Sequence, residues 1–269
     1  MRIVMVHGRG AEMEIPALME ADWAAALRYG LDRIHATVSP SSLDLRLAFY
    51  GDLWRPDFRQ PLPRIEPVPE EQEGLPSVGE ISLWVDQHLG VGDLLLDLLL
   101  RDVDGFFSEP ELRAATNQRL LDAVLAEPAD PDGVLVVGFS MGSLVAYDTL
   151  RQHPDLPVGA LITIGSPLAM PSFYRKLAAI GPTPFPAQLK MWVNLWTKDD
   201  PGTAGHMDFP GRFASADPQH PAVQDLETWG RPASPAQPAA AHDALDYMSS
   251  RVFARALVTG IAAVHGDGA

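Results

Sequence analysis

The sequence predicts an α/β fold, in which a mainly parallel β-sheet is flanked by helices. Short β-branched or apolar runs alternate along the chain with segments of helical periodicity, the pattern of strands joined by helical crossovers. The run at residues 134–137 is continuously apolar, as in a strand whose two faces are both covered. A chain of 269 residues fits one such domain, which we assign to residues 1–269.

The expected elements follow one another in chain order. Strands are predicted at residues 3–6, 43–50, 134–137, 161–164 and 191–196. The spacing of apolar residues predicts helices at residues 17–34, at 108–127 and from Ala241 to about residue 263. In the second helix, Ser108 is expected to be the cap, with Pro110 in the first turn and Pro128 at the end. Residues 202–238 are rich in Pro, Gly, Ala and Asp and are expected to be irregular.

A long insertion separates the second and third predicted strands, and we assign it to residues 53–107. Much of it is strongly apolar, and Gly90 and Gly92 are expected to divide it into short helices. Apolar side chains such as Trp84 and Leu95 are too numerous for a solvated loop, so they form either additional core or a lid over a pocket. The position favours a lid, because the insertion leaves the carboxyl end of a strand, where parallel sheets build their sites.

The composition excludes several classes of function. The formal net charge is −15, and so acidic a surface repels a phosphate backbone, which argues against a nucleic-acid partner. The chain has no cysteine, which excludes disulfides, thiolate metal sites and a cysteine nucleophile. The most apolar stretch, residues 94–100, is interrupted by Asp97 and is too short to span a bilayer. Because a predicted strand begins at Ile3, no signal peptide is expected, and a cytoplasmic location is the default.

Gly138-Phe139-Ser140-Met141-Gly142 is a G-x-S-x-G pentapeptide. The bare pattern is common, but here a predicted strand runs directly into it and a helical pattern leaves it. So tight a strand-to-helix turn forces the serine into a strained conformation that projects its hydroxyl above the sheet. The flanking glycines remove side chains that would clash, and the helix N-terminus favours negative charge that develops there. Ser140 is therefore the candidate nucleophile, and an ordinary glycine-lined turn is the alternative.

The loop after the first predicted strand, His7-Gly8-Arg9-Gly10, is rich in glycine. In enzymes with such a serine, one backbone N–H from this loop and one from the residue after the nucleophile stabilise the oxyanion. Arg9 N–H is the favoured loop donor, with Gly10 next, and Met141 N–H is the second donor. His7 is expected to be structural, and a simple tight turn is the alternative for the loop. The residues expected to line the substrate site are Gly8, Gly10, Phe139, Trp84 and Leu95.

A nucleophilic serine needs a base and a group that orients the base. In folds of this kind the order along the chain is Ser, then Asp or Glu, then His. Asp199 and Asp200 follow the strand predicted at residues 191–196, and His242 opens the last predicted helix. Ser140, Asp200 and His242 are therefore the candidate triad. The rivals that stay open are Asp199 as the acid and His206 or His220 as the base.

Several segments together resemble the α/β-hydrolase superfamily, in the lipase-like branch that includes GPI inositol-deacylase-like proteins and many bacterial hydrolases. The segments that carry the resemblance are Val6-His7-Gly8, Val137 to Ser143, Ile164 to Leu168, Asn194 to Pro201 and His242 to Tyr247. The resemblance covers most of the chain outside residues 53–107 and implies an α/β-hydrolase fold with a helical lid-like insertion. It favours Asp200 over Asp199, because the acid of that branch commonly precedes Pro or Val. Phe139 stands where many relatives have His, and Gly202 where an apolar residue is usual.

The expected function is hydrolysis of a small-molecule or lipid-like carboxylic ester. Ser140 would attack the ester, His242 would act as base with Asp200 orienting it, and Arg9 and Met141 N–H groups would hold the oxyanion. No cofactor and no metal are expected. Two alternatives stay open: a thioesterase, peptidase or acyltransferase that uses the same residues, and a non-catalytic protein of this fold that binds a ligand or a partner. The presence of all three triad residue types in the required order favours an enzyme.

Overall fold

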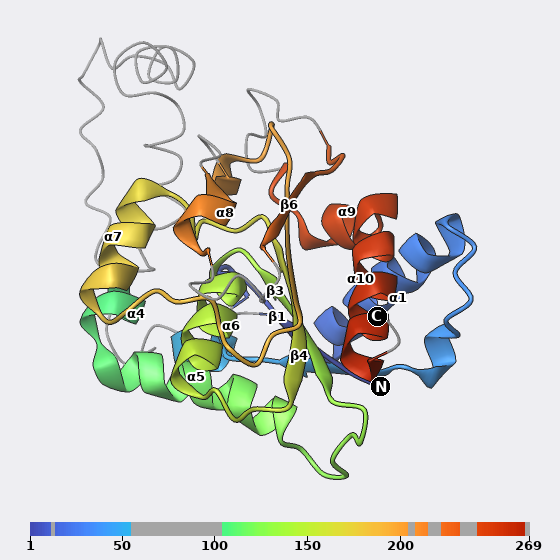
Figure 1. The fold of residues 1–269 in the computed structure, drawn as a ribbon, viewed down its shortest axis with the longest axis horizontal. Coiled ribbons are helices and arrows are strands. Elements are labelled where there is room, and N and C mark those ends of the chain that lie inside the picture. The colour runs from blue at the N-terminus through green and yellow to red at the C-terminus, as the bar shows by residue number, and fades with distance from the viewer. Residues whose placement is uncertain (12–13, 55–103, 204–207, 215–221, 232–240, 267–269) are drawn as a thin grey trace, which may run out of the picture.

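The computed structural model describes residues 1–11, 14–54, 104–203, 208–214, 222–231 and 241–266. Within these residues the strands form a six-stranded sheet in the order β2-β1-β3-β4-β5-β6, and every neighbouring pair is parallel. Helices cover both faces of the sheet (Figure 1). The chain therefore has the predicted α/β class of fold, a parallel sheet flanked by helices.

The strands are short, and the central ones are buried. Their bounds are β1 Arg2–Val6, β2 Asp44–Ala48, β3 Val134–Phe139, β4 Val158–Ile164, β5 Met191–Trp196 and β6 Gln224–Glu227. Every strand predicted from the sequence is present, with bounds that differ by a few residues. The prediction that residues 202–238 are irregular was wrong at β6. This strand was missed because it is polar and largely exposed at the edge of the sheet, so it lacks the apolar run of a buried strand.

The sheet is covered by α1 (Pro16–Arg33) and α10 (Arg251–His265) on one face and by α5 (Pro110–Val124) and α6 (Met141–Gln152) on the other (Figure 1). Shorter helices are α4 (Asp104–Ser108), α7 (Pro171–Ala179), α8 (Phe209–Arg212) and α9 (Ala244–Met248). Three 3-10 turns are η1 (Pro40–Ser42), η2 (Gly51–Trp54) and η4 (Pro201–Thr203). Helices α1, α5 and α7 each begin with proline, whose missing N–H has no helical partner at that position anyway.

The alternation of side chains along the strands divides the core into two layers. In β1, Ile3 and Met5 pack in one cluster with residues of α1 and α10, whereas Val4 and Val6 pack in the other with residues of α5 and α6. β3 alternates in the same way. Burial of each such side chain contributes about 1.5–3 kcal/mol. Since both faces of the central strands are closed to water, a site built on the described sheet must lie in the loops at the strand ends.

Two helical segments differ from the prediction. Ser108 is the last residue of α4 and its hydroxyl bonds within that helix, so it does not cap α5, whose N-cap is Glu109. α5 also ends earlier than predicted, at Val124. The single helix expected after Ala241 is in fact α9 followed by α10. The chain is interrupted between them because the Ser250 hydroxyl accepts a hydrogen bond from Phe253 N–H at 3.0 Å and starts a new helix.

Most of the insertion assigned to residues 53–107, with Trp84, Leu95, Gly90 and Gly92, lies outside the described residues. The strand after which the insertion begins, β2, is described. Because β2 and β3 both run parallel to β1, the carboxyl ends of β2 and β3 lie at the same edge of the sheet. The lid remains a prediction. Among the described helices, none is long and apolar enough to cross a membrane.

Candidate active site

The carboxyl edge of the sheet brings together residues that are far apart in sequence. Because the strand pairs are parallel, the segments that follow β1, β3 and β5 all emerge at this edge. They carry residues 7–10, Ser140 and Asp200, respectively, and His242 comes from the segment between β6 and α9. Four separate stretches of chain therefore contribute to the site.

Ser140 occupies the turn between β3 and α6 and is strained. Its backbone angles are φ 51° and ψ −122°, and among the described non-glycine residues only His35 also has a positive φ. Such a conformation costs on the order of 1–3 kcal/mol and persists only where neighbouring structure enforces it. Here Ser140 N–H donates to Ile164 O at 3.0 Å, and Ser143 N–H donates to Ser140 O at 2.9 Å. The turn thus holds the serine between the end of one strand and the start of a helix, in the strained conformation that the sequence predicts for this turn.

The two glycines of the pentapeptide are required by close backbone approach. A Cβ at Gly142 would lie 2.1 Å from Val6 O, and one at Gly138 would lie 2.7 Å from Ser143 Cα. These contacts are with the backbone, which cannot move aside as a flexible side chain can. The first contact lets α6 begin directly against the end of β1, so the G-x-S-x-G spacing has a steric cause in this chain.

We expect Gly142→Ala to lower the free energy of unfolding by about 3 kcal/mol or more, since overpacking against rigid atoms is strongly unfavourable. Gly159→Ala is the matched control, because a Cβ there meets only Val264, with its side chain nearest, at 3.2 Å, and should cost less than about 1 kcal/mol. Urea unfolding of the two variants measures the difference. Equal stabilities would contradict the steric account of the turn.

Asp200 and His242 form the central contact of the site. His242 Nδ1 lies 2.7 Å from Asp200 Oδ1, and the carboxylate is buried whereas the imidazole is slightly exposed. A carboxylate can only accept, so Nδ1 carries the proton and Nε2 of the neutral ring has a free lone pair. Asp199, the rival acid, is exposed at the surface. The structure therefore brings Asp200, and not Asp199, together with His242.

Two glycines make room for this pair. A Cβ at Gly202 would lie 2.3 Å from His242 Cε1, and Gly202 N–H donates to Asp200 Oδ1 at 2.6 Å. A Cβ at Gly165 would lie 3.0 Å from Asp200 Oδ2, and Gly165 has a positive φ of 55°. An apolar residue at position 202 would therefore displace the imidazole, which explains why this chain has glycine there.

Tyr247 is a residue of this site that the sequence analysis did not single out. Its hydroxyl donates to Asp200 Oδ2 at 2.6 Å, and its side chain is almost fully buried. Burial, and next the negative charge of Asp200, raise the pKa of Tyr247 well above its ordinary value. The phenol therefore stays protonated and remains a donor. No sequence signal distinguishes it from a core tyrosine of α9.

The loop after β1 approaches the serine closely. A Cβ at Gly8 would lie 2.9 Å from Ser140 Cβ, so the glycine lets the loop backbone approach Ser140 closely. His7 Nε2 accepts from Tyr50 N–H at 3.1 Å, which leaves Nδ1–H to donate to Gly8 O at 2.6 Å. The C=O and N–H of a trans peptide point in opposite directions, so Arg9 N–H points away from the His7 ring. These bonds give His7 a structural role in holding the loop.

Met141, the other expected oxyanion donor, is the first residue of α6 and is buried directly after Ser140. Its N–H belongs to the first turn of the helix, where backbone N–H groups have no partner within the helix. The partial positive charge of the helix N-terminus acts at the same place. Arg9 has its guanidinium over the Trp54 ring, 4.7 Å from the centroid, so its side chain packs on η2.

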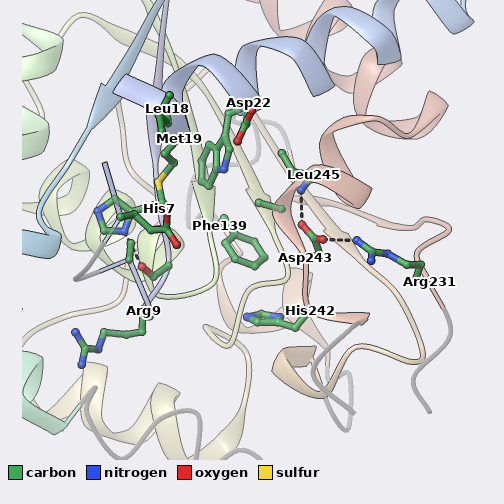
Figure 2. A pocket seen from close by; sticks show the side chains of 16 residues that line it. His7, Arg9, Leu18, Met19, Asp22, Phe139, Arg231, His242, Asp243 and Leu245 are labelled. Carbon is green, nitrogen blue, oxygen red and sulfur yellow. Dashed lines mark hydrogen bonds and ion pairs between the residues drawn. The ribbon is translucent and has the colours of Figure 1, made fainter. Parts of the chain in front are cut away.

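A cavity of about 470 Å³ opens beside these residues (Figure 2). Gly8 and Phe139 line it, and Ser140, which is 6% exposed, follows Phe139 directly and lies against Gly8, where a Cβ would be 2.9 Å from Ser140 Cβ. Figure 2 shows His242 near the Phe139 ring, and the two ring centroids are 4.7 Å apart. Other residues that line the cavity include Arg9, Gly10, Glu14, Leu18, Met19, Asp22, Trp23, Arg231, Asp243 and Leu245.

The cavity has an apolar wall and an acidic margin. The apolar wall comes mainly from α1, whose Leu18 and Met19 lie opposite His242 in Figure 2. At the other end, Asp243 is paired with Arg231, which also bonds Asp246, so this arginine's charge is already compensated. The contribution of α1 was not anticipated from the sequence, since a helix that precedes the nucleophile by more than a hundred residues has no motif that announces it.

The remaining predicted site residues lie outside the described part of the chain. These are the rival bases His206 and His220 and the substrate-site residues Trp84 and Leu95. Among the residues that are described, no group of three or more His, Cys, Asp or Glu side chains could hold a metal ion.

In comparisons with known proteins, no family model matches the chain and no curated protein matches it at a significant level. The chemistry of the site is therefore inferred from its geometry. That geometry comprises a strained serine at a helix N-terminus, a hydrogen bond between His242 and the buried Asp200, and a cavity lined by His242, Phe139 and residues of α1.

Proposed function

We propose that this chain is a serine hydrolase of the α/β-hydrolase fold that cleaves carboxylic esters through an acyl-enzyme on Ser140. The observation that carries the proposal is the hydrogen bond of 2.7 Å between His242 and the buried Asp200, at the same edge of the sheet as the strained Ser140. A buried carboxylate that fixes the tautomer of a histidine, at the same edge of the sheet as a strained serine, is the combination of groups that an activated nucleophile needs. The order Ser, Asp, His along the chain, each after its own strand, also agrees with this fold.

The proposed reaction has two halves. His242 Nε2 takes the Ser140 proton as Oγ attacks the ester carbonyl carbon, and the imidazolium then donates that proton to the departing alkoxide. Water attacks the acyl-enzyme in the second half, with His242 again as base and then as acid. Asp200 stabilises the imidazolium in both halves, and Arg9 and Met141 N–H groups stabilise the oxyanion.

The cavity supports an uncharged substrate with an apolar group. Leu18, Met19 and Phe139 offer an apolar wall, and the acidic Glu14, Asp22 and Asp243 outnumber the basic Arg9 and Arg231 among the lining residues, which disfavours a negative charge on the ligand. A formal net charge of −15 acts in the same direction over a longer range. We therefore propose a neutral ester with a short or medium apolar acyl or alcohol group.

A panel of chromogenic esters of graded acyl length tests this proposal. The value of kcat/KM should rise by up to about fourfold per methylene, the equivalent of ~0.8 kcal/mol, until the cavity is full. Leu18→Ala should lower the increase in kcat/KM by about threefold for the longest acyl chain that the cavity accommodates. Leu125→Ala, equally exposed at 56% against 60% for Leu18 but at the end of α5, should leave the profile unchanged. Absence of turnover across the panel would sink the esterase proposal, and a flat profile would rule out the apolar wall as the acyl site.

A further inference from the structure

Asp200 has both of its carboxylate oxygens occupied by hydrogen-bond donors. Oδ1 accepts from His242 Nδ1–H and from Gly202 N–H, and Oδ2 accepts from the Tyr247 hydroxyl at 2.6 Å. A carboxylate held at one oxygen only can turn about its Cβ–Cγ bond. One that is held at both oxygens presents a fixed lone pair to the imidazole.

We propose that Tyr247 is a positioning residue of this site: its hydroxyl anchors Asp200 and so sets both the orientation and the proton affinity of His242. The inference rests on the proposed function for its effect on catalysis. Its effect on the titration of His242 does not depend on that function.

The local structure couples the anchor to the base. Tyr247 lies on α9, which begins directly after His242, and the Asp243 side chain accepts from Leu245 N–H at 2.9 Å to cap this helix. The capped helix therefore carries the tyrosine at a fixed distance from the histidine. The Tyr247 ring also packs near Phe139, with centroids 6.4 Å apart, so the side chain has little freedom. The segment from His242 to Tyr247 thus supplies both the proposed base and the hydroxyl that holds Asp200, the partner of that base.

The charge of Asp200 gives the sign of the effect. A hydrogen bond to Oδ2 draws part of the negative charge away from Oδ1, which faces the imidazole. Without the hydroxyl, more charge faces Nδ1 and the imidazolium is better stabilised. His242 should therefore bind its proton more tightly and titrate at higher pH, while the loosened carboxylate orients the ring less well.

Other charged groups lie at the margin of the site and have partners or solvent of their own. Asp243, next to His242, is paired with Arg231, and Lys198 and Asp199 on the β5 turn are exposed. Across the cavity the charged residues are Arg9, Glu14 and Asp22. None of these charged groups is altered by a substitution at Tyr247, so they affect the titration of His242 equally in the parent protein and in the variant.

The test is an NMR titration of the His242 ring proton in the parent protein and in Tyr247→Phe. The midpoint should rise by about one pH unit, a tenfold change in proton affinity, and the acid limb of kcat/KM should move with it. The rate constant kcat should fall roughly tenfold, which is the usual scale for loss of a hydrogen bond to a charged group. A purely structural tyrosine would leave both pH curves in place.

Tyr147→Phe is the matched control. Tyr147 is also buried and its hydroxyl makes one hydrogen bond, to Pro184 O at 2.7 Å, but it lies in the other core layer. It should lose comparable stability with no shift of the His242 titration. In the parent protein, the Tyr247 hydroxyl proton should also be protected from exchange and resonate downfield, a measurement that needs no variant.

The outcomes separate the two proposals. A shift in Tyr247→Phe together with Ser140-dependent ester hydrolysis supports both. A shift without any ester hydrolysis by the parent upholds the anchoring of Asp200 and overturns the esterase. Unchanged midpoints and kcat in Tyr247→Phe, equal shifts in both variants, or a freely exchanging Tyr247 hydroxyl would overturn the positioning role.

Discussion

Ser140→Ala is expected to lower kcat for ester hydrolysis on the order of 10⁶-fold, because the acyl-enzyme can no longer form. Alanine has the same backbone restriction as serine at φ 51°, so the strain of the turn is unchanged and the fold should be retained. Steady-state kinetics with the best ester of the panel, beside a thermal unfolding curve, measures both effects.

Ser143→Ala is the comparison that isolates the nucleophile. Ser143 is three residues away and also buried, and its hydroxyl donates to Ser140 O at 2.5 Å. Its loss should cost stability of about 1 kcal/mol and a modest part of the rate. If Ser140→Ala were to turn over esters near the parent rate, or if Ser143→Ala were the more damaging change, the nucleophile would be misassigned.

Asp200→Asn is expected to lower kcat by roughly 10⁴-fold, by analogy with the acid of other triads. An amide carries no negative charge and cannot stabilise the imidazolium that forms when His242 takes the serine proton. The NH₂ of the new amide can only donate, and it must face either His242 and Gly202, which both donate to Asp200, or Tyr247. If the NH₂ faces His242, Nδ1 of the imidazole must accept, so the tautomer of the base is reversed. If the NH₂ faces Tyr247, the tautomer is kept, but the negative charge that stabilises the imidazolium is still missing.

The control for this prediction is Asp199→Asn, since Asp199 is adjacent but exposed. It should change kcat by less than about twofold, as surface substitutions away from a site usually do. His242→Ala should be as damaging as the loss of the nucleophile, whereas His206→Ala and His220→Ala should be mild. A crippled Asp199→Asn beside a mild Asp200→Asn would reverse the assignment of the acid.

The buried strands and the turn at Ser140 could be predicted because their signals are local. A continuously apolar run marks β3, and the two glycines around Ser140 are adjacent in sequence to the strand and the helix that they join. Asp200 and His242 could be proposed from their order in the chain. Their hydrogen bond could not, since it depends on how η4 and the segment before α9 meet in space.

What escaped prediction depends on contacts between distant segments. β6 is a polar edge strand that is recognisable only by its pairing with β5. Tyr247 reads in the sequence as one more apolar position of the last helix, and only the fold shows its hydroxyl on Asp200. In the sequence, Gly202 departs from the resemblance, because an apolar residue usually stands at this position after the acid. The structure shows that the His242 ring occupies the space that a side chain at position 202 would need.

Labelling with a fluorophosphonate probe tests whether Ser140 is an activated nucleophile, because the probe reacts with such a serine and requires no knowledge of the natural ester. We expect a single covalent adduct per chain, located on Ser140 by peptide mass spectrometry, absent from Ser140→Ala and formed far more slowly in Asp200→Asn. An adduct on another residue, or a parent protein that remains unmodified under conditions that label an ordinary serine hydrolase, would contradict this expectation.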